Sequence, residues 1–159
     1  MSSVVSGVAQ PVAQSVAIGR GGLAAPPVGY GAAALGNLYR ALGDDEWPGI
    51  VPAAWAGGIR YFDVAPHYGL GLAERRLGES LRQLPRDEYI VSTKVGRLLV
   101  PQDAAGRTDI DNLFDVPADH RRVQDYSRDG VLRSIEQSLE RLGLDRIDIA
   151  LVHDCLLYT

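Results

Sequence analysis

The sequence lacks the features that mark several classes of protein. Its single cysteine, Cys155, excludes an internal disulfide and fits a reducing compartment, so we expect a cytoplasmic protein. No apolar run approaches the roughly 18 residues that a membrane span needs, and we expect no membrane insertion. A net charge of −4 gives no basic footprint for nucleic acid. No zinc-spaced cysteine–histidine cluster and no Gly-Lys-Ser/Thr phosphate loop is present, so we expect no metal site.

The composition is that of one globular domain. The chain has 159 residues, of which 46% are hydrophobic and 23% charged, which is ordinary for a protein with a single core. Residues 1–17 are rich in Ser, Ala, Val and Gln and repeat "VAQ". They lack the basic start and apolar stretch of a secretory signal. We expect a disordered extension there, with organelle import as an alternative, and a folded domain over 18–154.

Strand and helix patterns alternate along the chain. Four apolar segments predict strands: 28–35, 58–65, 88–95 and 146–153. Leucine spacing predicts helices over 72–84 and 131–143, with Gly143 as the C-cap. The crossover 44–58 is the weakest helix prediction, because prolines stand at both 48 and 52. Strict alternation predicts an α/β fold with parallel strands.

Two α/β architectures fit this alternation, a (β/α) barrel and an open doubly wound sheet. An open dinucleotide-binding sheet carries G-x-G-x-x-G after its first strand, whereas glycines 29, 31 and 36 miss that spacing. A barrel requires functional residues at the carboxyl ends of several strands. That requirement is met, because Asp63, Lys94 and His153 each end a predicted strand and Tyr68 follows Asp63 closely. The pattern favours a barrel with one polar site.

These four side chains suit proton transfer to or from an oxygen while a hydride moves at the attached carbon. A free tyrosine has a pKa of about 10, and a nearby lysine ammonium lowers such a pKa by roughly 1–3 units. We therefore expect Lys94 to activate Tyr68, with Asp63 compensating the lysine charge. His153 would orient a substrate oxygen.

The stretches "GIRYFDVAPHYGLGLAERRLGESL", "YIVSTKVGR" and "SLERLGLDRIDIALVHD" resemble the N-terminal half of an aldo-keto reductase. That family is built on a (β/α)8 TIM barrel and uses NADP or NAD. The resemblance runs from 18 to 154 and covers four of eight β/α units, so it implies a half barrel. It places the catalytic tetrad on four residues: Asp63, Tyr68, Lys94 and His153.

The same resemblance implies binding residues and a substrate class. The backbone turn that meets the cofactor falls on Gly31, Ala32 and Ala33, with Asp63 beside it, and His67, Tyr68 and His153 line the substrate pocket. The chain is most similar to the sugar dehydrogenase branch, which includes L-fucose dehydrogenase and D-threo-aldose 1-dehydrogenase. It implies oxidation of an aldose such as L-fucose or D-arabinose at C1. Another aldehyde or ketone reductase, such as a pyridoxal dehydrogenase, is the alternative.

Two further readings remain beside the enzyme: a non-catalytic nicotinamide-binding regulatory subunit, and a structural half barrel that pairs with another chain. As a half barrel the chain would expose two sheet edges, and we expect it to self-associate and to be inactive by itself. The tail 155–159, "CLLYT", is apolar where the family has a polar loop. We therefore expect it to be non-native.

Three local expectations concern the regions around the predicted site. Residues 96–128 form a long segment without predicted structure, either a substrate-covering lid or a solvated insertion. Phe114 and Tyr126 are its expected anchors. Glu74 and Glu79 are expected to lie on the surface of the helix over 72–84.

Overall fold

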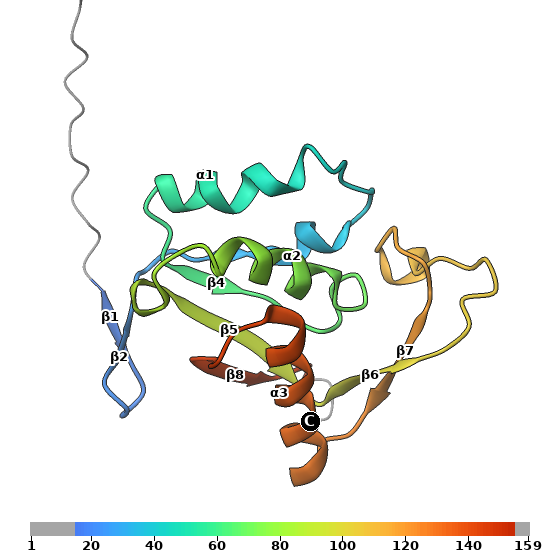
Figure 1. Cartoon of the computed structure of the whole chain (residues 1–159). Helices are drawn as coiled ribbons and strands as arrows, with labels where there is room; N and C mark the ends of the chain where they lie inside the picture. The colour runs from blue at the N-terminus through green and yellow to red at the C-terminus, as the bar shows by residue number, and fades with distance from the viewer. Residues whose placement is uncertain (1–14, 155–159) are drawn as a thin grey trace, which may run out of the picture.

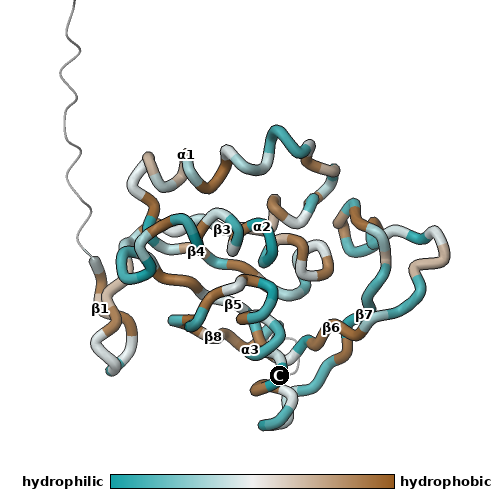
Figure 2. Tube along the Cα trace, viewed as in Figure 1, coloured by the Kyte–Doolittle hydropathy of each residue, from teal (hydrophilic) through white to brown (hydrophobic). Residues whose placement is uncertain are grey.

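A computed structural model describes residues 15–154. Its centre is a four-stranded parallel sheet in the order β3-β4-β5-β8, and Figure 1 shows β4, β5 and β8 side by side. The strands are β3 (Tyr30–Gly31), β4 (Tyr61–Asp63), β5 (Ile90–Val95) and β8 (Ile149–Val152). Each lies within one of the four predicted segments, so the predicted parallel α/β arrangement is confirmed. β5 and β8 are largely hydrophobic, as Figure 2 shows.

Three helices pack against the sheet: α1 (Ile50–Ala56), α2 (Leu72–Leu81) and α3 (Arg128–Leu142). α2 lies between the other two (Figure 1) and buries Leu77 and Leu81 in the main core. Ser127 is the N-cap of α3, and its hydroxyl accepts a hydrogen bond from the Gly130 N–H. It ends as predicted at Gly143, whose φ of 62° suits a residue without Cβ. No helix in the described part of the chain is long and apolar enough to span a bilayer.

The weakest predicted helix is split at its prolines. Pro48 lies in the 3-10 turn η2 (Trp47–Gly49), and α1 then starts at Ile50. Pro52 is the third residue of α1, where a backbone N–H has no helical partner in any case. The two prolines therefore fit two short pieces of helix, whereas one continuous helix through both would lose a hydrogen bond.

The strand predicted over 28–35 is mostly wrong. Only Tyr30–Gly31 pairs with β4, and Ala32–Gly36 forms the 3-10 helix η1. Ala32 and Leu35, three residues apart, are both fully buried in the core that includes α2. A spacing of three places them on one side of a 3-10 helix, which a strand with its period of two cannot do.

The N-terminal extension predicted over 1–17 overlaps the first strand of the structure by two residues. Val16–Ile18 forms β1, which pairs antiparallel with β2 (Leu23–Ala25). The remainder of the extension, residues 1–14, and the predicted non-native tail, 155–159, lie outside the described residues.

The segment 96–128 is not structureless. It folds into an antiparallel hairpin of β6 (Arg97–Pro101) and β7 (His120–Gln124), with the short 3-10 turn η4 (Ile110–Asn112) between them. Figure 1 shows this hairpin beside the end of the sheet. The sequence signal was weak because neither strand alternates with a period of two: β6 reads RLLVP, with three apolar residues in a row, and β7 reads HRRVQ, with one apolar residue.

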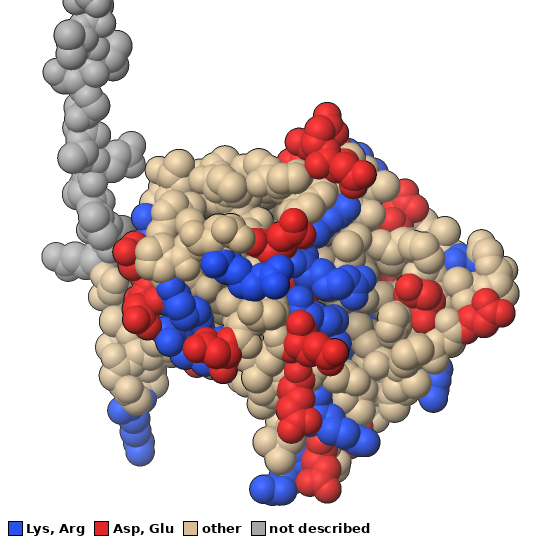
Figure 3. Space-filling model, in the orientation of Figure 1, with Lys and Arg blue, Asp and Glu red and all other residues tan. Residues whose placement is uncertain are grey.

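Glu74 is not a surface residue, contrary to expectation. Its side chain is fully buried between α2, α3 and β5, where it accepts hydrogen bonds from Thr93 Oγ1 (2.8 Å) and Arg141 Nε (2.6 Å). Glu79, on the opposite face of α2, is exposed as expected. Elsewhere acidic and basic side chains are interspersed over the face seen in Figure 3.

Candidate active site

Two of the predicted residues form an ion pair at the carboxyl ends of β4 and β5. Asp63 is the last residue of β4 and pairs in register with Ser92 of β5, two residues before Lys94. Lys94 Nζ lies 2.6 and 2.7 Å from the two carboxylate oxygens of Asp63 and 3.0 Å from the Val64 carbonyl. The side chains of Lys94 and Asp63 are 15% and 31% exposed, so the pair is partly shielded from water.

Sequence reasoning missed two residues behind this pair. The hydroxyl of Ser92 donates to Asp63 Oδ1, and the hydroxyl of Tyr61 donates to Ser92 Oγ at 3.1 Å. Ser92 is fully buried. A signal was present, because residues two apart in a strand share a face, which places Ser92 with Lys94 and Tyr61 with Asp63. Asp63 is thus held from two sides.

Tyr68 lies next to the ion pair but is not activated in the way the sequence suggested. Lys94 Nζ is 5.8 Å from the centre of the Tyr68 ring, and among residues 15–154 no hydrogen bond joins the two side chains. The three protons of the ammonium already point at Asp63 and the Val64 carbonyl. Burial, and then the negative charge of Asp63, raise the pKa of Tyr68 above its usual 10. The expected lowering is therefore wrong for the chain without cofactor.

His67 and His153 face each other across the site. Their rings are 5.5 Å apart and nearly perpendicular, and the Tyr68 ring is 6.2 and 6.5 Å from them. Burial first, and then nearby positive charges, lower the pKa of each histidine from 6.5 to about 4. Both imidazoles are therefore neutral at pH 7. His67 Nδ1 lies 3.4 Å from Arg97 Nη1, which can only donate, so His67 Nε2 is left to donate to a substrate oxygen. His153 Nδ1 is buried, so His153 would meet a substrate through Nε2.

The turn expected to meet a nicotinamide cofactor fits a flat group. Gly31 pairs directly with Asp63 across the sheet, and a Cβ added to Gly31 would meet nothing within 4 Å. Ala32 and Ala33 follow in the first turn of η1 and add only methyl groups. Space over Gly31 beside the ion pair would accommodate a planar ring close to the backbone.

A separate cavity of about 740 Å³ opens at the other end of the strands. It lies between the β1–β2 hairpin and residues 57–60 and 87–90, and none of the four predicted catalytic residues lines it. In parallel α/β folds the chemistry is found at the carboxyl ends of strands. The ion pair, the tyrosine and the two histidines therefore define the candidate site.

Polar groups gathered at the carboxyl ends of adjacent parallel strands are the arrangement of an α/β-barrel enzyme. The comparisons with known proteins identify the family: the chain belongs to the aldo/keto reductase family, whose pattern matches residues 27–159. It is 57% identical over 135 residues to a D-threo-aldose 1-dehydrogenase of Pseudomonas, covering 84% of this chain and 41% of the relative. It is 42% identical to the pyridoxal 4-dehydrogenase of Microbacterium luteolum, covering 87% of this chain and 42% of that protein.

Solved structures agree on the fold. An aldo-keto reductase of Pseudomonas aeruginosa superposes with a TM-score of 0.64 at 33% identity, covering 89% of this chain and 47% of that one. An aldo-keto reductase of Klebsiella pneumoniae, solved in complex with NADPH, gives a TM-score of 0.58 at 24% identity, covering 89% and 39%. The chain thus spans about two fifths of the length of the curated relatives it matches.

Proposed function

We propose that this chain carries the proton-transfer site of an NAD(P)-dependent oxidoreductase that oxidises an aldose, such as L-fucose or D-arabinose, at C1 to the lactone. Its four-stranded sheet would be the first half of a (β/α)8 barrel. The observation that carries the proposal is the Asp63–Lys94 ion pair beside the half-buried side chain of Tyr68, whose ring centre lies 5.8 Å from Lys94 Nζ. The 57% identity to a D-threo-aldose 1-dehydrogenase supports the substrate class.

In this proposal the side chains have separate tasks. The bound nicotinamide, held over Gly31, Ala32 and Ala33, would supply the hydride acceptor. Tyr68 takes the proton of the anomeric hydroxyl in oxidation and returns it in reduction. Neutral His67 and His153 hydrogen-bond to the substrate oxygens, as expected for a polyhydroxylated ligand.

The raised pKa of Tyr68 favours one direction of the reaction at neutral pH. At neutral pH the phenol is protonated, which favours its role as an acid in carbonyl reduction. Oxidation needs the phenolate, so its rate should rise with pH across the range below 10. Two N–H groups of the Lys94 ammonium donate to Asp63. If one of them turned toward Tyr68 instead, it would stabilise the phenolate, because a positive charge would then face the developing negative charge.

The test uses this chain and a version extended by the second half of the Pseudomonas relative. We expect the extended protein to oxidise L-fucose or D-arabinose with NAD or NADP, and Tyr68→Phe to abolish turnover while leaving nicotinamide binding nearly unchanged. Tyr89→Phe is the matched control, because its hydroxyl bonds the Leu81 carbonyl in the core near the amino end of β5. A Tyr68→Phe variant that keeps more than about a tenth of the rate, a barrier loss under about 1.4 kcal/mol, would refute the role of the tyrosine.

The same assays separate the alternatives. Turnover of pyridoxal in place of an aldose would favour the second substrate class, which the 42% identity to a pyridoxal 4-dehydrogenase supports. Nicotinamide binding without turnover of either class would favour a regulatory subunit.

A further inference from the structure

The insertion between β5 and α3 turns back onto the site instead of into solvent. Its loop bonds the segment after η1 through two backbone hydrogen bonds, Tyr39 N to Leu113 O (2.7 Å) and Asp115 N to Asn37 O (2.9 Å). Leu38 also forms an isolated antiparallel bridge with Phe114. The hairpin is therefore attached to the chain that follows the candidate cofactor turn.

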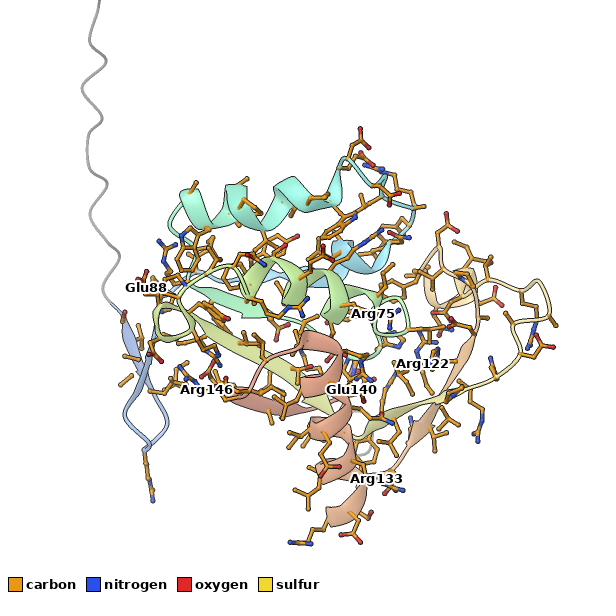
Figure 4. The ribbon with its side chains drawn as sticks, in the orientation of Figure 1. Arg75, Glu88, Arg122, Arg133, Glu140 and Arg146 are labelled. Carbon is orange, nitrogen blue, oxygen red and sulfur yellow. The ribbon has the colours of Figure 1, made fainter. Side chains whose placement is uncertain are left out.

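Arg122 of β7 attaches the hairpin to the catalytic loop as well. Its guanidinium makes a two-pronged ion pair with Asp109, with Nη1 2.8 Å from Oδ1, and Nη2 also donates to the His67 carbonyl at 3.0 Å. Asp109 is 6% exposed and the Arg122 side chain 14%. Figure 4 shows Arg122 on the sheet side of the hairpin. Separating such a buried pair would leave both charges uncompensated.

Asp109 in turn shapes the turn that carries Phe114. Its backbone carbonyl accepts from the Asn112 N–H (3.0 Å) and the Phe114 N–H (3.3 Å), and its side chain accepts from Asn112 Nδ2. Phe114 is 3% exposed. Its ring meets the His67 ring edge-on at 5.5 Å and lies 6.0 Å from the Tyr68 ring at an angle of 32°. The turn thus places one aromatic ring behind both site residues.

We propose that Arg122 is a positioning residue of the active site: it holds the His67 carbonyl directly and, through Asp109, presses Phe114 against His67 and Tyr68. The inference rests on the proposed function, in which Tyr68 transfers the proton. The insertion is on this view a fixed wall of the site, and neither the substrate-covering lid nor the solvated insertion that the sequence left open. Small displacements of a reacting group are costly, since a misplacement of about 1 Å can lower a rate about 100-fold.

The charge of Arg122 provides a second readout. The charged and titratable groups facing His67 are Arg122 from β7, Arg97 from β6, Asp109 from the hairpin loop and His153 after β8. After burial, the Arg122 charge is the next cause that lowers the pKa of His67, to about 4. Removing this charge should therefore raise the pH at which His67 titrates.

The first experiment follows the histidine titrations by NMR in this chain. We expect Arg122→Met to raise the midpoint of His67, and Arg122→Lys to leave it close to that of the unaltered chain because the charge remains. Arg121→Met, an exposed neighbour on the same strand, is the matched control and should change nothing. If Arg122→Met leaves the His67 midpoint where Arg121→Met does, the proposal is wrong.

The second experiment measures aldose oxidation in the extended protein. We expect Arg122→Lys to lower kcat about 10-fold to 100-fold with KM nearly unchanged, because lysine donates from a single nitrogen and cannot reproduce the paired Nη1 and Nη2 bonds that fix Asp109 and the His67 carbonyl in one geometry. A kcat for Arg122→Lys equal to that of Arg121→Met would overturn the positioning role, and this comparison decides even if Arg122→Met fails to fold. Should the unaltered extended protein show no turnover, the proposed function fails, while the His67 titration still decides whether Arg122 acts on the catalytic loop.

Discussion

The buried carboxylate of Glu74 joins three elements of the fold and should be a major contributor to stability. It connects α2 to β5 through Thr93 and to α3 through Arg141, whose guanidinium also donates to Ser138 Oγ at 3.2 Å. The substitution Glu74→Met keeps a side chain of similar length but removes both acceptors. Arg141, only 13% exposed, is then left without its counter-charge.

The magnitude follows from these contacts. Removing one partner of a buried ion pair costs about 3–5 kcal/mol, and the lost bond from Thr93 falls within that sum. We therefore expect Glu74→Met to lower the free energy of unfolding by about 4 kcal/mol. For a domain of this size each kcal/mol lowers Tm by about 2–4 °C, which gives a decrease of about 8–16 °C. Glu74→Gln keeps the shape and one oxygen that accepts from Arg141, and its amide can donate to the Thr93 hydroxyl, but it loses the charge and should cost about half as much.

Urea unfolding followed by circular dichroism measures these differences. Glu79→Met, on the exposed face of the same helix, is the matched control and should change stability by less than about 0.5 kcal/mol. The double variant Glu74→Met/Arg141→Met should cost less than the sum of the single variants, because no unpaired charge remains. A Glu74→Met variant as stable as Glu79→Met would show that the buried network contributes nothing.

Three further outcomes are expected. Gly78→Ala should destabilise by about 1–3 kcal/mol in urea unfolding despite the helix preference of alanine, because its Cβ would overlap the carbonyl of Leu142; a more stable variant contradicts the close α2–α3 packing. Because the pKa values of His67 and His153 are lowered from 6.5 to about 4, the unfolded chain binds protons first, and the urea midpoint should fall as pH decreases from 6.5 toward 4. A midpoint constant over that range contradicts this. Val152 is 50% exposed on β8, the edge strand of the sheet. Val152→Lys should therefore reduce the self-association of the chain measured by light scattering, because a charge on an edge strand disfavours pairing with a second copy. If the variant associates as much as the unaltered chain, this edge is not the site of association.

The sequence was informative wherever a local pattern of apolar and polar residues was enough to decide the outcome. Asp63 and Lys94 end apolar runs, and parallel strands bring their carboxyl ends to one edge, so their proximity could be predicted without knowing any contact. The helix over 131–143 was predicted in part: leucine spacing indicated a helix and Gly143 its end, but α3 begins at Arg128 and Leu132 of the leucine face is 43% exposed.

The errors share a physical cause, which is that partners distant in sequence override local pattern. Glu74 resembles a surface helix residue until Arg141, 67 positions later, supplies its counter-charge. The hairpin of β6 and β7 is stabilised by contacts such as Arg122 to the His67 carbonyl, 55 positions apart. Neither pairing leaves a periodic trace in the segment itself, so composition and spacing could not reveal it.

The state of Tyr68 shows the same limit within the site. The residue types implied that Lys94 would lower the pKa of the phenol, but an ammonium has only three protons, and here Asp63 and the Val64 carbonyl receive them. Ser92 and Tyr61 hold Asp63 in place from the other side, which keeps its negative charge near the phenol. Burial first, and then that negative charge, therefore raise the pKa of Tyr68. The presence of a lysine in the sequence does not decide the direction of the shift, because burial and Asp63 raise the pKa while the ammonium protons are used elsewhere.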